Sequence, residues 1–248
     1  MTDSDKLIRR MNYFKSLVKN AIEITGLCGK ILDVGCGPGT STNILKELLP
    51  KNTIFGIDIN SDYINIAISQ YPEINFKNID CYSTPFEDCC FDSCFALNLF
   101  EVLAEPVEAL KEIKRITKRG GIICVIDVDY RNIVVKPQII HLKKLQRINS
   151  LLKRRNGFDP YVGSKLVDLF SIAGLQNVHG TMIRIDNISS DGFENTLLYD
   201  DDDKDYLIKS GFFTTEQISD MFTEYNILKK TNDFVYAIDY NLVYCKNT

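Results

Sequence analysis

The sequence lacks any apolar run that approaches the roughly 20 residues a helix needs to cross a bilayer, and residues 1–10 are polar. It also lacks an excess of basic residues: 29 Lys and Arg stand against 33 Asp and Glu, a formal net charge of −4. Nucleic-acid binding requires a clustered basic surface, which this balance does not supply. We therefore expect a cytoplasmic protein with neither a membrane nor a nucleic acid among its partners.

Paired Cys-x-x-Cys motifs are absent as well, although the chain has eight cysteines. Cys81, Cys89, Cys90 and Cys94 lie close together in the sequence, but their spacing does not match the usual ligand sets of structural zinc sites. With no secretory signal evident, the thiols are expected to stay reduced. We therefore predict no metal site.

Apolar runs alternate with amphipathic stretches over residues 30–118, which is typical of repeated β-α units around a parallel sheet. Hydrophobic residues make up 45% and charged residues 25% of the 248 residues, as in ordinary globular proteins. The expected strands are residues 31–34, 53–57, 74–79, 91–97, 122–128, 176–185 and 234–244. The pattern predicts one α/β domain.

Helical periodicity is expected in residues 7–24, from residue 41, and in 64–71, 107–114, 138–155 and 161–173. Asn60 or Ser61 is suited to cap the helix at 64–71, and Thr214 with Gln217 forms a capping box that opens a further helix. Residues 189–210 are polar and acidic, and we interpret them as a mobile surface excursion.

A glycine-rich turn follows the first expected strand, in the segment LDVGCGPGT of residues 32–40. A buried strand that leads into such a turn and then a helix lets backbone approach a ligand closely. The turn does not match the GxxxxGK[ST] phosphate loop, and it lacks the third glycine of a clean GxGxxG dinucleotide motif. Asp33 stands two positions before the first glycine, where a carboxylate repels a pyrophosphate and attracts a cation.

Two more carboxylates follow the next two expected strands. Asp58 ends the second, where it can accept hydrogen bonds from both hydroxyls of a ribose. Asp80 follows the third, where it can reach an adenine edge in the same crevice. Together with Asp33, these residues predict a ligand with an amine, a ribose and an adenine but no phosphates, as in S-adenosylmethionine.

Four motifs resemble those of the class I S-adenosylmethionine-dependent methyltransferases, in order and at family spacing. They are LDVGCGPGT (32–40), GIDIN (56–60), PFEDCCFD (85–92) and KEIKRITKRGG (111–121). The resemblance covers residues 30–130 and looks closest to the ubiquinone-biosynthesis-like and small-molecule methyltransferases. A weaker likeness continues through IDVDY (126–130) and GFDPYVGSKLVDLFSIAGL (157–175).

The resemblance implies a Rossmann-like seven-stranded, mostly parallel sheet with helices on both faces and an antiparallel last strand. It implies a single methyltransferase domain over residues 1–248, with a cofactor-binding core at 27–130. The lid and acceptor segments would be residues 1–26, 131–160 and 187–213. The cofactor-binding residues implied are Asp33, Gly35, Cys36, Gly37, Gly39, Asp58, Ile59, Asp80, Cys81 and Asn98.

The implied reaction moves a methyl group from S-adenosylmethionine, which becomes S-adenosylhomocysteine, to an O or N atom of a small molecule, in specialised metabolism. The protein mainly aligns the acceptor with the methyl carbon, and a general base is optional. The catalytic candidates are Asp127, Asp129 and Tyr130, with His141 and Tyr161 as weaker alternatives. The Asn/Asp-Pro-Pro-Tyr/Phe motif of amino-directed DNA and protein methyltransferases is missing.

Several alternatives stay open. The chain could be another S-adenosylmethionine enzyme, which modifies the cofactor or catalyses a cyclisation, or a catalytically silent module that binds the cofactor. A metal-dependent catechol-type mechanism is kept open by the two aspartates of the 126–130 segment. The basic side chains of residues 138–155 could cover an anionic substrate, although a solvated helix face is favoured. A monomer or a homodimer is expected.

Overall fold

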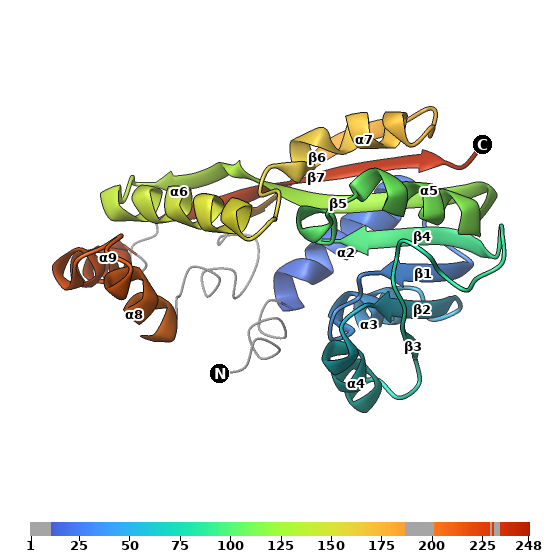
Figure 1. The fold of residues 1–248 in the computed structure, drawn as a ribbon, viewed down its shortest axis with the longest axis horizontal. Coiled ribbons are helices and arrows are strands. Elements are labelled where there is room, and N and C mark those ends of the chain that lie inside the picture. The colour runs from blue at the N-terminus through green and yellow to red at the C-terminus, as the bar shows by residue number, and fades with distance from the viewer. Residues whose placement is uncertain (1–10, 187–200, 229, 231–233) are drawn as a thin grey trace.

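A seven-stranded sheet forms the centre of the computed structural model, which describes residues 11–186, 201–228, 230 and 234–248 (Figure 1). The strands are β1 Lys30–Val34, β2 Thr53–Asp58, β3 Asn75–Asn78, β4 Phe91–Leu97, β5 Thr117–Lys136, β6 His179–Asp186 and β7 Val235–Lys246. Their order is β3-β2-β1-β4-β5-β7-β6. β1 to β5 pair in parallel, whereas β7 is antiparallel to both of its neighbours. The predicted sheet with an antiparallel last strand is therefore confirmed.

Different helices cover the two faces of this sheet. The helices are α2 Met11–Thr25, α3 Thr40–Leu48, α4 Ser61–Gln70, α5 Pro106–Ile116, α6 Ile140–Arg155, α7 Leu166–Ile172, α8 Asp201–Lys209 and α9 Thr215–Leu228, with 3-10 helices η1 Phe100–Val102 and η2 Val162–Lys165. Leu17 of α2 and Leu45 of α3 pack in one buried cluster, and Leu110 of α5 and Phe170 of α7 pack in another. Neighbouring residues of one strand serve opposite clusters because side chains alternate along a strand.

Two helix starts follow from local sequence. Asn60 Oδ1 accepts hydrogen bonds from the backbone N–H groups of Asp62 and Tyr63, at 2.9 and 3.1 Å. At the start of α9, the Thr214 hydroxyl accepts from Gln217 N, and the Gln217 side chain accepts from Thr214 N, at 3.1 and 3.2 Å. Both predicted caps are confirmed, since each satisfies N–H groups that a first helical turn leaves unpaired.

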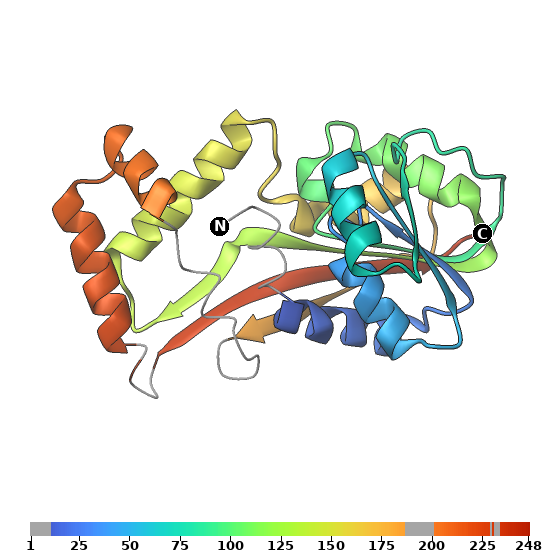
Figure 2. The ribbon, with the colours of Figure 1, turned by 90° about the horizontal axis from the view of Figure 1, so that it is seen from below.

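The fifth strand is much longer than the seven residues predicted for it. β5 runs for 20 residues, and its pairing with β7 shifts between Val128 and Ile133 and then resumes. Beyond this shift, residues 133–136 of β5 pair with residues 235–238 of β7. Figures 1 and 2 show this pair of strands running beyond the core toward α6. A segment predicted to be part of a lid therefore begins as a continuation of the sheet.

Two other predicted segments differ from the structure. Residues 161–173, predicted to form one helix, divide into the 3-10 helix η2 and α7. The predicted surface excursion at 189–210 contains α8, which spans Asp201–Lys209. Its earlier part, residues 189–200, lies outside the described residues, as does the start of the predicted N-terminal helix.

No helix in the described part of the chain is both long and apolar enough to cross a membrane. All eight cysteines are free thiols. Among the described residues, no group of three or more His, Cys, Asp or Glu side chains is arranged to hold a metal ion.

Candidate active site

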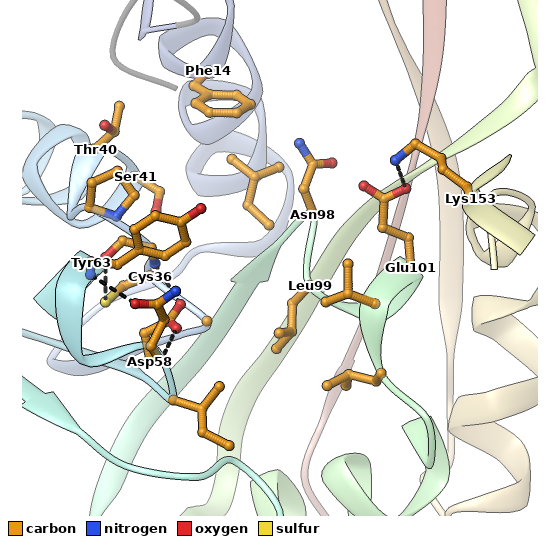
Figure 3. Close-up of a pocket in the computed structure, with 18 of the residues that line it drawn as sticks. Phe14, Cys36, Thr40, Ser41, Asp58, Tyr63, Asn98, Leu99, Glu101 and Lys153 are labelled. Atoms are coloured by element: carbon orange, nitrogen blue, oxygen red, sulfur yellow. Dashed lines mark hydrogen bonds and ion pairs between the residues drawn. The ribbon is translucent and has the colours of Figure 1, made fainter. Parts of the chain in front are cut away.

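A cavity of about 950 Å³ lies at the carboxyl ends of β1, β2 and β4. One part, the glycine-turn side, is lined from residues 35–41, 57–63 and 79–82. The other part, the α6 side, is lined from residues 101–104, 130–156 and 236–240. Figure 3 shows Asn98 and Leu99 between the two sides. Small-molecule sites occupy about 300–1,000 Å³, so this cavity has room for two small ligands.

The glycine-rich turn is held in place by the neighbouring strand. The backbone N–H groups of Gly35 and Cys36 both donate to the carbonyl oxygen of Ile57, at 2.8 and 2.9 Å. Gly37 N donates to Asp58 Oδ2 at 2.8 Å. The turn therefore presents backbone to the cavity in a fixed position, as close approach to a ligand requires.

Gly37 and Gly39 have different uses, although both have positive φ. A Cβ atom on Gly37, which lines the cavity, would meet nothing within 4 Å. A Cβ atom on Gly39 would lie 2.9 Å from the Phe76 ring and 3.0 Å from Ala67 Cβ. Gly39 is absent from the cavity lining, and its lack of a Cβ atom allows α3 to pack closely on α4 and β3.

Asp58 lies at the centre of the glycine-turn side. Its Oδ1 atom accepts from Asn60 N at 2.8 Å, and its Oδ2 atom accepts from Gly37 N. These two contacts fix the carboxylate at the end of β2 while each oxygen keeps a lone pair for a ligand. Ile59 follows it with 69% of its surface exposed, and it also lines the cavity.

Asp80 and Cys81 line the same side, as predicted, from the loop after β3. The exposed Asp80 carboxylate accepts a hydrogen bond from Tyr82 N at 2.9 Å. Burial raises the pKa of the Cys81 thiol to about 12, so it is neutral at physiological pH. The pair therefore offers an anionic acceptor beside a small apolar surface.

Asn98 directly follows β4 and has a positive φ of 54°. Its backbone N–H donates to the carbonyl oxygen of Ile126 at 3.0 Å, which fixes its position at the sheet edge. Its buried Oδ1 atom has no hydrogen-bond partner among the described residues. Because an unpaired buried polar atom is costly, this oxygen is suited to accept a hydrogen bond from a ligand.

Asp33 is brought near this site but does not line it. Its Oδ2 atom accepts from the hydroxyls of Ser41 and Thr42 at 2.6 and 2.7 Å, and its Oδ1 atom has no partner in the described structure. Ser41 itself lines the cavity. Asp33, which was expected to orient the ligand amine directly or through water, positions the start of α3 from behind Ser41.

Burial raises the pKa of Asp33 from 3.8 to about 7, and nearby Asp58 adds to the shift. The folded protein then holds a proton between pH 4 and 7 that the unfolded chain releases, so the free energy of unfolding falls as pH rises through this window. Between pH 5 and 7, the free energy of unfolding of the wild type should fall by roughly 2 kcal/mol relative to that of Asp33→Asn. Denaturant unfolding at both pH values measures this difference. If the difference between the wild type and Asp33→Asn stays constant with pH, the prediction is wrong. Asp62→Asn, at an exposed site, is the control.

Asp127 also lies outside the cavity lining, as does Asp129. The Oδ2 atom of Asp127 accepts from the backbone N–H groups of Phe100 and Glu101, at 2.8 and 3.2 Å, and its Oδ1 accepts from Val128 N at 2.8 Å. Its contacts are therefore those of a structural anchor for η1, not of a group that reaches the acceptor. This corrects its predicted catalytic role.

Asp129 accepts its hydrogen bonds from groups outside the cavity lining. Its carboxylate accepts from Arg131 N and from the Arg131 guanidinium, with a contact of 2.9 Å to Nε. The guanidinium also donates to Ser164 and lies 4.8 Å from the centre of the Tyr161 ring. Asp129 and Tyr161 thus hold Arg131 outside the cavity lining. Tyr130, the third catalytic candidate, does line the cavity. His141 does not line the cavity.

Of the two charged residues on the α6 side, Glu101 was given no role from the sequence, and Lys153 was expected only as one of the basic side chains of residues 138–155. Lys153 of α6 donates to Glu101 Oε2 of η1 at 2.7 Å, and both line the cavity. Figure 3 shows this ion pair on the far side of Asn98 from Asp58. No local pattern links residues 52 positions apart. The lining residues Tyr236, Ile238 and Tyr240 did leave a signal, because alternation along a strand predicts that they share one face.

Comparison with known protein families finds a methyltransferase domain at residues 32–125. An uncharacterized methyltransferase of Schizosaccharomyces pombe is 30% identical over 171 residues, which are 61% of this chain and 59% of that protein. A trans-aconitate 2-methyltransferase of Rhodopseudomonas palustris is 30% identical over 98 residues, 39% of this chain and 37% of that one. The chain thus spans less than two thirds of the length of either relative.

Among solved structures, an S-adenosylmethionine-dependent methyltransferase of Thermotoga maritima superimposes with a TM-score of 0.61. The match covers 99% of this chain and 96% of that one, at 15% sequence identity. At this identity the likeness shows the fold, and it extends beyond the 32–125 segment to the strands and helices that line the α6 side.

Proposed function

Because the chain carries a methyltransferase domain of the class I S-adenosylmethionine-dependent family, we propose that it transfers a methyl group from S-adenosylmethionine to an O or N atom of a small-molecule acceptor. One observation carries this proposal: a single cavity joins the glycine-turn side to the α6 side, with Asn98 between them. A cofactor and an acceptor bound on the two sides would meet at this residue.

The residues of the glycine-turn side fit the proposed cofactor. The backbone at Gly35 and Gly37 would cradle the methionine portion, and the unpaired Asn98 Oδ1 would accept a hydrogen bond from its ammonium group. Asp58 would accept from the two ribose hydroxyls. The exposed face of Ile59 would pack on the adenine.

Asp80 and Cys81 would meet the edge of the adenine, one as a hydrogen-bond acceptor and the other as an apolar contact. Cys36, which also lines the cavity, would pack beside the methionine portion. The ordering of these groups along the cavity follows the ordering of β1, β2 and β3 in the sheet.

When bound, the cofactor supplies an electrophilic methyl carbon: the acceptor lone pair forms the new bond to it, the carbon–sulfur bond breaks with its electrons on sulfur, and S-adenosylhomocysteine remains. The chain aligns the acceptor for this step and excludes water. Tyr130 and Glu101, both in the cavity lining, would contact the acceptor, and an acceptor hydroxyl would pass its proton to the Glu101 carboxylate.

Incubation with methyl-labelled S-adenosylmethionine and a panel of phenols, amines and carboxylic acids tests the proposal. We expect label in one acceptor class and an equal amount of S-adenosylhomocysteine, with both lost in Asp58→Ala. Cofactor binding without any transfer across the panel would contradict enzymatic activity and favour the catalytically silent alternative. A role in specialised metabolism is part of the same proposal, and the small-molecule acceptor is supported by a relative named for trans-aconitate.

A further inference from the structure

The α6 side is lined mainly by apolar and aromatic side chains of three elements. Tyr130 and Ile133 come from β5, Leu145 and Leu152 from α6, and Tyr236 and Ile238 from β7. The β5 and β7 residues are brought together by the pairing beyond the register shift, where Ile133 lies opposite Ile238. Such a lining favours apolar ligand surface by the area that it removes from water.

Only two charged residues of the described lining belong to the α6 side, Glu101 and Lys153, and they neutralise each other. Their side chains are 11% and 27% exposed. Lys153 Nζ also lies 4.6 Å from the centre of the Tyr130 ring. The cation is thus already paired, and a ligand with several carboxylates would lose hydration without gaining a free positive charge.

The other basic side chains of α6 do not change this balance. Lys144 donates to Gln217 and lies 4.4 Å from the centre of the Phe213 ring, whereas Lys143 and Arg147 are exposed. None of these three residues lines the cavity. The basic charge of the helix, apart from Lys153 in its ion pair with Glu101, therefore lies outside the cavity lining.

A polar anchor is nevertheless present. The Nε2 atom of Gln146, one turn before Asn149 and Ser150 on α6, is buried without a hydrogen-bond partner in the described structure, and Gln146 lines the cavity. A buried N–H donor in this position favours a ligand that brings an oxygen acceptor. A hydroxyl or carbonyl oxygen would supply it without adding charge.

We propose that the acceptor is an uncharged, largely apolar molecule with an oxygen-bearing end, bound between α6 and the β5–β7 strand pair. This inference rests on the proposed function and names its substrate class. It sets this chain apart from the trans-aconitate 2-methyltransferase that it resembles over 98 residues, since trans-aconitate is a tricarboxylate.

Adjacent leucines on α6 provide a matched test. Leu152 lines the cavity, whereas Leu151 is 61% exposed and does not. The neutral fluorescent probe N-phenyl-1-naphthylamine would be titrated into the wild type, Leu152→Lys and Leu151→Lys, each with and without S-adenosylhomocysteine. We expect Leu152→Lys to bind the probe about tenfold more weakly and Leu151→Lys to bind it within twofold of the wild type.

Competition measures the charge preference directly. We expect 1-naphthol to displace the probe, and trans-aconitate to fail at concentrations 100-fold higher. Glu101→Gln, which leaves Lys153 unpaired, should gain at least fivefold in affinity for trans-aconitate. Thermal unfolding and S-adenosylhomocysteine titration of each variant confirm that the fold and the glycine-turn side are intact.

Two results would overturn the inference: equal loss of probe binding in both leucine variants, or displacement by trans-aconitate at concentrations where 1-naphthol has no effect. Failure of the proposed function gives a different result, because it is measured by the transfer assay, in which no acceptor then gains label, whatever the probe does. The titrations without S-adenosylhomocysteine assess the α6 side independently in that case.

Discussion

Asp58→Ala is expected to weaken S-adenosylhomocysteine binding by about 100-fold. The Asp58 carboxylate would accept from two ribose hydroxyls, and hydrogen bonds to a charged group contribute about 1.5–3 kcal/mol each. The substitution also removes the acceptor that fixes Gly37 N at 2.8 Å, so the glycine-rich turn loses one of its restraints. Isothermal titration calorimetry with S-adenosylhomocysteine measures the loss.

Asp62→Ala is the matched control, because Asp62 is exposed in the first turn of α4 and does not line the cavity. It should bind S-adenosylhomocysteine within twofold of the wild type. Asp58→Asn keeps the shape of the side chain and one acceptor oxygen, so an intermediate loss of about tenfold is expected. If Asp58→Ala binds within threefold of the wild type, the ribose assignment is wrong.

Asp127→Ala should lower the free energy of unfolding by about 3 kcal/mol, because it leaves three backbone N–H groups without their acceptor, two of them at the start of η1. Burial and the neighbouring Glu101 raise the pKa of Asp127 to about 8, against the opposing effect of the three N–H donors. A raised pKa alone would suit a general base, but the carboxylate is occupied away from the cavity. Denaturant unfolding at pH 7 measures the loss.

Asp168→Ala, at an exposed position in the first turn of α7, is the control for Asp127→Ala and should cost less than about 1 kcal/mol. A variant that folds with wild-type stability but has lost all methyl transfer would instead identify Asp127 as the catalytic base. The two measurements therefore separate the structural anchor from the role that the sequence predicted.

The glycine-turn side could be predicted almost completely. Asp58, Ile59, Asp80 and Asn98 all line the cavity where the strand ends were expected to bring them. Parallel strands place their carboxyl ends at one edge of the sheet, so residues after successive strands meet without knowledge of the packing. The exceptions are Asp33 and Gly39, which do not line the cavity. The Asp33 side chain contacts the start of α3, and Gly39 lies where α3 packs against its neighbours.

The α6 side could not be predicted in the same way. A catalytic role was given to Asp127 and Asp129 because they end a strand, yet their partners are backbone N–H groups after β4 and a nearby arginine. Whether a strand-end carboxylate faces a ligand or a neighbouring loop depends on the path of that loop. The acidic segment before α9 was interpreted as a mobile surface excursion, and part of it forms the helix α8.

By itself, the sequence determined the alternation of strands and helices, the caps at Asn60 and Thr214, and most of the residues that line the glycine-turn side. These features depend on periodicity and turn chemistry within short segments, which a single chain displays directly. Only the tertiary structure decided the α6 side, because it joins β5 to residues 235–238 and pairs Glu101 with Lys153. Contacts between such distant residues depend on the register of the strands and the docking of α6, neither of which is encoded in any local pattern.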